Sequence, residues 1–177
     1  MDDIVKAALA KWPNVPHCYG WLALDARGDW YMRDERVQAR GAFPRVKGSR
    51  IDHDKLRAFI HRNYLHDGAG CWYFQNGPQR VYVELEAAPW IWRLHDAAGA
   101  APRIESHTGL AARYESAWQD ESGRLFVATE VGLGLVHTLD MQAASDAVEA
   151  GAWVVKSCAF AELPQRYAYR LKPEPVT

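Results

Sequence analysis

The sequence predicts an α+β protein built from two related hairpin–helix–hairpin units, with mainly antiparallel sheets that pack together. Three observations indicate this fold. Short aromatic and aliphatic runs alternate with turns rich in Asp and Gly, apolar residues recur at helical spacing between these runs, and the two halves of the chain repeat a similar order of pieces. The 177 residues are 49% hydrophobic and 24% charged, which is typical of a globular chain.

Two units of unequal length are expected. An N-terminal α+β unit with a leading helix should cover residues 1–95, and a C-terminal α+β unit should cover residues 103–177. The segment Asp96–Pro102 is rich in Ala and Gly and is the candidate boundary between them. The alternative is that both halves form one compact domain, which a chain of this length also permits.

The first elements are a helix and a hairpin. Apolar residues follow one helical face over Asp2–Trp12, and Pro13 ends the stretch. The aromatic and aliphatic runs Tyr19–Leu24 and Asp29–Met32 flank the turn-rich segment Asp25–Gly28. This pattern predicts two antiparallel strands.

A basic stretch comes next, followed by a second helix. Residues Arg33–Arg50 contain six Lys and Arg against two acidic residues, a net charge of +4, and their glycines and proline favour a loop or sheet edge. A helix is expected from Asp52 or His53 to Tyr64, because Leu, Phe and Ile form an apolar stripe. Glycines 68 and 70 should close it.

The first half ends with more strands. Cys71–Phe74 and Arg80–Leu85 should form a hairpin around the turn Gln75–Pro78, and Pro89–Leu94 should form a further strand. Alternation along the second of these strands places Val and Leu on one face and Arg80, Tyr82 and Glu84 on the other.

The second half echoes the first. Asp25–Met32 resembles Asp120–Val127, each with an Asp, a Gly and three apolar residues in the same register. A Trp-containing strand followed by a Pro-Gln-Arg strand also occurs in each half, as Trp72–Phe74 with Pro78–Val83 and as Trp153–Val155 with Pro164–Tyr169. The Ala-rich segment Met141–Gly151 takes the place of the first-half helix. These echoes indicate an internal duplication, and a cleft between two such units is the natural place for a ligand.

These pieces also resemble a proteobacterial family of unknown function with internally repeated α+β motifs. The resemblance rests on Asp29–Tyr31, Trp72–Phe74, Val83–Trp90, Gly132–Leu133 and Asp146–Gly151, and covers about residues 20 to 170. It implies a role in ligand binding or signalling and supplies no catalytic residue. Two features depart from the family pattern: Ala87 stands where the family has Asp, and the family's Pro-Ile-x-Arg turn is not clear within residues 41–45.

Charge and composition exclude several classes of function. The formal net charge is −1, which argues against a protein that neutralises nucleic-acid phosphates. The chain contains no uninterrupted run of about 18 apolar residues and does not begin like a secretory signal, so neither a membrane span nor secretion is expected. Cys18, Cys71 and Cys158 lack metal or redox spacing and are expected to be reduced thiols in the cytoplasm.

No pattern supplies a cofactor site or a catalytic centre. His53, His61 and His66 lie near acidic residues, but their spacing does not place them on one helical face, so no metal site is predicted. The glycines of Gly132–Leu135 belong to no nucleotide-binding motif and are expected to form a turn. We predict no bound cofactor and no enzymatic activity; the alternative is an enzyme of unknown class.

If the chain were an enzyme, its titratable groups would have to converge in a pocket. The members then expected are His61, His137, Glu84 and Cys71.

Two sets of residues are candidates for binding. Arg80, Tyr82, Glu84, Trp90 and Trp92 lie on strands and combine a cation, a hydroxyl and rings, which suits a planar or anionic small molecule. The competing interpretation is an ordinary solvent-facing strand surface.

The second candidate set belongs to the basic stretch. Arg33, Arg36, Arg40 and Arg45 could form a surface for an anion or a protein partner, or a solvated loop. The sequence therefore predicts a non-enzymatic module that binds a small ligand or transmits a signal, with protein–protein interaction through an aromatic or basic surface as the alternative.

Overall fold

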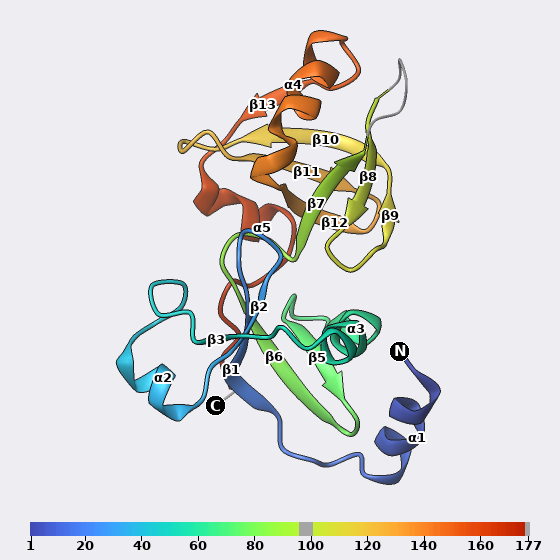
Figure 1. Ribbon diagram of the computed structural model, residues 1–177, viewed down its shortest axis with the longest axis vertical. Helices are drawn as coiled ribbons and strands as arrows, with labels where there is room; N and C mark the ends of the chain where they lie inside the picture. Colours follow the sequence, from blue (N-terminus) through green and yellow to red (C-terminus); the bar gives the residue numbers. More distant parts are fainter. Residues whose placement is uncertain (96–100, 176–177) are drawn as a thin grey trace. The chain divides into compact units, whose positions relative to one another are not determined.

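The computed structural model describes residues 1–95 and 101–175. The described chain is a mixed α+β structure with two mixed sheets, and it divides into two compact units (Figure 1). The first unit comprises Met1–Asp25, Asp29–Glu86 and the chain from Tyr169 onward, and the second comprises Ala26–Gly28 and Ala87–Ala168.

The first unit contains a sheet of six strands in the order β3-β2-β1-β6-β5-β4. Its strands are β1 (Cys18–Leu24), β2 (Trp30–Met32), β3 (Ser49–Arg50), β4 (Tyr64–His66), β5 (Trp72–Asn76) and β6 (Gln79–Leu85). The expected hairpins β1–β2 and β5–β6 are confirmed as antiparallel pairs. At the centre, β1 runs parallel to β6, with Leu22 opposite Val83 and Leu24 opposite Leu85.

Three helices accompany this sheet: α1 (Asp3–Lys11), α2 (Glu35–Arg40) and α3 (Asp54–Arg62). The first and third agree with the expected helices. The His53 side chain accepts a hydrogen bond from the Leu56 backbone N–H and so caps α3. The helix buries Ile60 and places the Phe59 ring edge-on to Phe74 of β5.

One expectation for this unit was right only in part, and one was wrong. Much of the basic stretch is loop or the edge strand β3, as expected, but residues Glu35–Arg40 form the helix α2, because the Asp34 carboxylate accepts a hydrogen bond from the Val37 N–H and Gly41 ends the helix. The chain after α3 forms the edge strand β4, because Tyr64–His66 pairs with β5 before the glycines are reached. A strand pairing of this kind depends on distant residues and leaves little local signal.

The second unit contains a sheet of seven strands in the order β13-β10-β11-β12-β7-β8-β9. These strands are β7 (Trp90–His95), β8 (Arg103–Ser106), β9 (Ala111–Ala112), β10 (Tyr114–Gln119), β11 (Leu125–Thr129), β12 (Gly132–Val136) and β13 (Val155–Ser157). The helical elements are η1 (Thr138–Asp140), α4 (Met141–Glu149), η2 (Phe160–Glu162) and α5 (Leu163–Arg166). The expected hairpin around Asp120–Gly123 and the expected helix after residue 140 are both present.

Three expectations for the second half were wrong. Pro164–Tyr169 is not a strand: Pro164 lies in the first turn of α5, where its missing N–H does no harm, whereas in a sheet it would interrupt the ladder. The order hairpin–helix–hairpin is present in the first unit, where α2 and α3 lie between the hairpins β1–β2 and β5–β6, but in the described part of the second unit α4 follows the strands β7 to β12 and β13 comes after it without a hairpin partner of its own. Gly132–Leu135 belongs to strand β12 and not to a turn.

The two sheets share one topology. In each, two antiparallel three-strand meanders meet through parallel central strands, β1 with β6 in the first unit and β7 with β12 in the second. The hairpin β1–β2 thus corresponds to β7–β8, whereas the sequence echo matched it with β10–β11. Apart from these parallel central pairs and the parallel pair β10–β13, the described pairings are antiparallel.

The division between the units differs from the expected one. Strand β7 pairs with β12 and β8, so residues 87–95 group with the second unit, and the chain from Tyr169 returns to the first. The Leu85 N–H donates to the Leu171 carbonyl oxygen at 2.8 Å, which anchors that return. Residues 96–100 of the expected boundary lie outside the described residues.

Candidate functional site

The candidate site of the first unit is built around an ion pair between Arg33 and Glu84. Arg33 directly follows β2, and its backbone N–H donates to the Trp21 carbonyl oxygen of β1 at 2.9 Å. Glu84 lies on β6, the parallel neighbour of β1, and its carboxylate accepts a hydrogen bond from Arg33 Nη1. The exposed fractions of the two side chains are 3% and 10%, so the charges are shielded from bulk water.

The Arg33 guanidinium also holds the loop that follows α2. Its Nη2 donates to the Gly41 carbonyl oxygen at 2.7 Å, and its Nε donates to that of Val46 at 3.3 Å. The Gln38 side chain donates to the Arg33 carbonyl oxygen at 2.9 Å and so ties α2 to the same point. Gly20 faces the Gln38 side chain and has a positive φ of 77°, a conformation that favours glycine.

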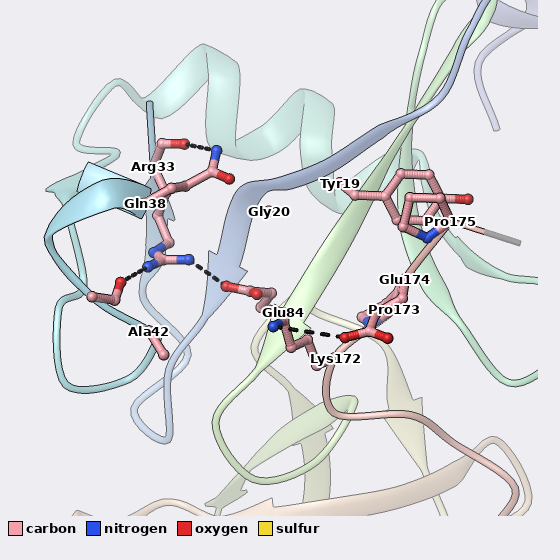
Figure 2. A pocket seen from close by; sticks show the side chains of 11 residues that line it. Tyr19, Gly20, Arg33, Gln38, Ala42, Glu84, Lys172, Pro173, Glu174 and Pro175 are labelled. Atoms are coloured by element: carbon pink, nitrogen blue, oxygen red, sulfur yellow. Dashed lines mark hydrogen bonds and ion pairs between the residues drawn. The ribbon is translucent and has the colours of Figure 1, made fainter. Parts of the chain in front are cut away.

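A cleft of about 540 Å³ opens over this ion pair (Figure 2). This volume is within the range of small-molecule sites. The lining combines charged and polar side chains, an aromatic ring, two glycines and two prolines: Tyr19, Gly20, Arg33, Gln38, Gly41, Ala42, Glu84, Lys172, Pro173, Glu174 and Pro175.

The buried pair does not use its full hydrogen-bonding capacity. A guanidinium carries five N–H groups, and three of the Arg33 N–H groups donate hydrogen bonds to acceptors in the protein. Glu84 accepts through Oε2, and within residues 1–95 and 101–175 its Oε1 has no hydrogen-bond partner. The floor of the cleft therefore presents both an acceptor and donors to a molecule that enters it.

The outer wall of the cleft comes from the end of the described chain. Lys172 and Glu174 form an exposed ion pair with an N–O distance of 3.7 Å, next to Pro173 and Pro175. Tyr19 and Pro175 both line the cleft, and Figure 2 shows the Tyr19 ring on the side of the cleft away from Arg33. Tyr19 is held by stacking on Tyr82, with ring centroids 4.6 Å apart.

The structure separates the residues expected to bind a ligand together. Glu84 lines the cleft, whereas Arg80 lies over the Tyr73 ring, with 4.6 Å from its guanidinium carbon to the ring centroid. The Tyr82 hydroxyl donates to the Asp67 carboxylate at 3.0 Å. Burial raises the pKa of Tyr82 to about 12, and the Asp67 carboxylate acts in the same direction.

Trp90 and Trp92 belong to the second unit and are part of its interior. Their exposed fractions are 6% and 0%. The Trp92 indole N–H donates to the Val127 carbonyl oxygen at 2.9 Å, and that of Trp90 donates to Val131 at 3.0 Å. Both side chains thus hold β7 against β11 and the turn that follows it, because a buried indole needs such a partner.

The four arginines of the basic stretch do not form one surface. Arg36, Arg40 and Arg45 are exposed, whereas Arg33 is buried in the ion pair. A charge count along the sequence cannot make this distinction, because the partner of Arg33 lies 51 residues away.

The groups expected to converge in an enzyme occupy different environments. His61 Nε2 accepts a hydrogen bond from the Trp30 indole at 3.0 Å, and burial lowers the pKa of His61. Cys71 packs among Tyr73 and Tyr82, and burial raises the pKa of its thiol. His137 lies in the second unit, where its ring accepts from the Leu139 N–H.

The histidines near the acidic residues are also apart. His53 caps α3, and His66 is exposed beside the Trp72 ring. In the described part of the chain, no three His, Cys, Asp or Glu side chains are arranged to hold a metal. No helix within the described ranges has the length and apolar composition needed to cross a membrane.

The sequence interpretation missed the role of Arg33 and the contribution of residues 172–175. One signal could have indicated the pair: Glu84 stands in the apolar run Val81–Leu85, and a buried carboxylate requires a cation or hydrogen-bond donors. The return of the chain end to the first sheet has no comparable signal, because Leu171 contributes through its backbone.

These features define an α+β protein of two mixed sheets, the first of which carries a cleft over a buried ion pair. The chain belongs to the family described as "Protein of unknown function (DUF2946)", whose model matches residues 1–174. No curated protein matches it.

A solved structure shows a weak likeness. The crystal structure of a DUF1285 family protein from Shewanella baltica OS155 has a TM-score of 0.45 and 13% sequence identity, over 71% of this chain and 91% of that chain.

Proposed function

We propose that this protein is a non-enzymatic module that binds a small polar molecule in the cleft of the first unit. The observation that carries the proposal is the buried Arg33–Glu84 pair, whose remaining hydrogen-bonding groups line a cavity of about 540 Å³. Ligand sites typically combine a concave surface with a few fixed polar groups, and this cleft has both.

A purely structural role for the ion pair is the competing explanation. Replacing a buried pair by apolar residues is often neutral or stabilising, so stability alone is weak grounds for the presence of these charges. In addition, a pair that served only to hold α2 would gain from using both carboxylate oxygens. The unused Glu84 Oε1 at the cleft therefore favours a ligand.

A ligand screen tests the proposal. Thermal unfolding of the protein should be measured against amino acids, sugars, nucleotides, organic acids and divalent cations. A ligand at about 100 times its dissociation constant adds about 2.7 kcal/mol, which corresponds to a rise of roughly 5 to 11 °C in the midpoint for a chain of this size.

Variants then locate the site. Glu84→Gln keeps the shape of the side chain and should abolish most of the ligand-induced shift, whereas Glu115→Gln, an exposed position in the second unit, should leave it unchanged. A ligand whose shift is the same in both variants binds elsewhere and refutes the assignment of the cleft. A screen with no response in any chemical class refutes ligand binding.

A protein partner is a second candidate function, supported by the exposed arginines at and after α2. Arg36 and Arg40 lie on this helix, and Arg45 follows it. Charge reversal by Arg36→Glu and Arg40→Glu should then abolish a partner that the wild-type protein captures. An unchanged set of captured proteins would exclude this surface.

We further propose a cytoplasmic role in sensing or signalling. A binding module without enzymatic activity would serve in sensing or signalling, and the shared topology of the two sheets supports an origin by duplication. All three cysteines are free thiols, which supports a cytoplasmic location.

A further inference from the structure

We infer that the ligand of this cleft is a zwitterion, a free α-amino acid with an apolar side chain. The inference rests on the proposed function, because it names the chemistry of the molecule that the cleft would hold. It follows from the balance of charges, from the open hydrogen-bonding groups and from the apolar wall.

The charges that line the cleft cancel. Arg33 is paired with Glu84 on the floor, and Lys172 is paired with Glu174 on the outer wall. An anion that approaches the guanidinium also approaches the carboxylate bonded to it, and a cation meets the reverse problem. A ligand with a single charge is therefore repelled by one member of each pair. A molecule that carries both charges close together is attracted by both members.

The open hydrogen-bonding groups match the two ends of such a molecule. Glu84 Oε1 can accept from an ammonium group, and the unused N–H groups of Arg33 can donate to a carboxylate. Lys172 and Glu174 are exposed, and their pair holds little energy in solvent, so both side chains can turn toward the ligand at small cost.

The apolar part of the ligand has a place on the opposite side. Tyr19, Pro173 and Pro175 line the cleft, and Figure 2 shows the Tyr19 ring on the side away from Arg33. Stacking on Tyr82 fixes the plane of this ring before any ligand arrives. An aliphatic or aromatic side chain can pack there while its ammonium and carboxylate groups face Arg33 and Glu84.

The test compares three forms of one molecule: L-phenylalanine, N-acetyl-L-phenylalanine and L-phenylalaninamide. They share the side chain but are a zwitterion, an anion and a cation. Titration calorimetry on the wild-type protein should show binding of the free amino acid, and binding at least tenfold weaker for each of the other two. The same series with L-leucine tests whether the side chain need only be apolar.

Variants supply the second measurement. Glu84→Gln should weaken L-phenylalanine at least tenfold, and Glu115→Gln should not change it. If Glu84→Gln does not fold, as judged by circular dichroism, Tyr19→Ala replaces it, because loss of the ring should weaken L-phenylalanine and L-leucine while leaving the preference for the zwitterion over the amide intact.

The outcomes separate this inference from the proposed function. Equal binding of the N-acetyl form or of the amide overturns the zwitterion. A sugar, nucleotide or organic acid that binds in a Glu84-dependent manner, with no response to amino acids, overturns the inference and upholds the cleft as a ligand site. The absence of binding by every class overturns both.

Discussion

Removal of one member of the Arg33–Glu84 pair should destabilise the protein strongly. The exposed fractions of the two side chains are 3% and 10%, so each charge regains only a small part of its hydration when the other is lost. Breaking a buried pair in this way costs about 3 to 5 kcal/mol. Arg33→Met also frees the carbonyl oxygens of Gly41 and Val46, which places it at the upper end of that range.

The two changes together should cost less than their sum. Glu84→Leu alone leaves the guanidinium buried without its counter-charge, and the double variant leaves no unpaired charge. We expect a coupling free energy of about 2 to 3 kcal/mol between the two positions.

The assay is urea unfolding of the wild type, both single variants and the double variant, followed by far-ultraviolet circular dichroism. The dependence of the unfolding free energy on urea must be the same in all four proteins, because a changed slope would indicate a different unfolding reaction. Additivity within about 0.5 kcal/mol, or a cost below about 1 kcal/mol for Arg33→Met, would refute the view that the two charges depend on each other.

Three further predictions follow from other parts of the structure. Gly134→Ala should destabilise the second unit by about 1 to 3 kcal/mol, because the new Cβ would lie 2.3 Å from the buried Trp92 Nε1. Gly68→Ala, which has open space around it, should change the midpoint of thermal unfolding little. Equal midpoints for the two variants would contradict the packing of Trp92. Below pH 6.5 the wild type should lose stability relative to His61→Gln. Burial lowers the pKa of His61, so the unfolded chain binds the proton first, and protonation removes the acceptor of the Trp30 indole N–H. Parallel plots of unfolding free energy against pH between pH 7 and 5 would exclude this effect. Cys71 should react with a disulfide reagent more slowly than the half-exposed Cys18, because burial raises the pKa of the Cys71 thiol, and mass spectrometry of the partly modified protein should find Cys18 labelled first.

Much of the secondary structure could be predicted because its causes are local. The helix at residues 54–62 follows from an apolar stripe, a capping residue before it and basic residues in its last turn. The hairpins around residues 25–29 and 120–124 follow from an Asp whose carboxylate accepts backbone N–H groups within the turn. Such contacts involve neighbours in the chain, so the pattern of residues is enough to indicate them.

The errors arose where pairing is long-range. Local sequence could not identify Tyr64–His66 as the strand β4, nor the segment at Pro164 as a helical turn instead of a strand. Short segments take the structure that their distant partners allow. The sequence echo failed as an alignment for the same reason. It matched turns that look alike, whereas the shared topology of the two sheets is a property of strand order.

By itself, the sequence determined the class of fold and the main hairpins and helices, and it included Glu84 among the candidate residues. The tertiary structure decided which residues Glu84 meets. It brought Arg33 from 51 residues away, added the wall formed by residues 172–175, and placed Trp90 and Trp92 in the interior of the other unit. The physical reason is that burial and ion pairing depend on the order in which strands pair, and that order is set by the packing of the whole unit.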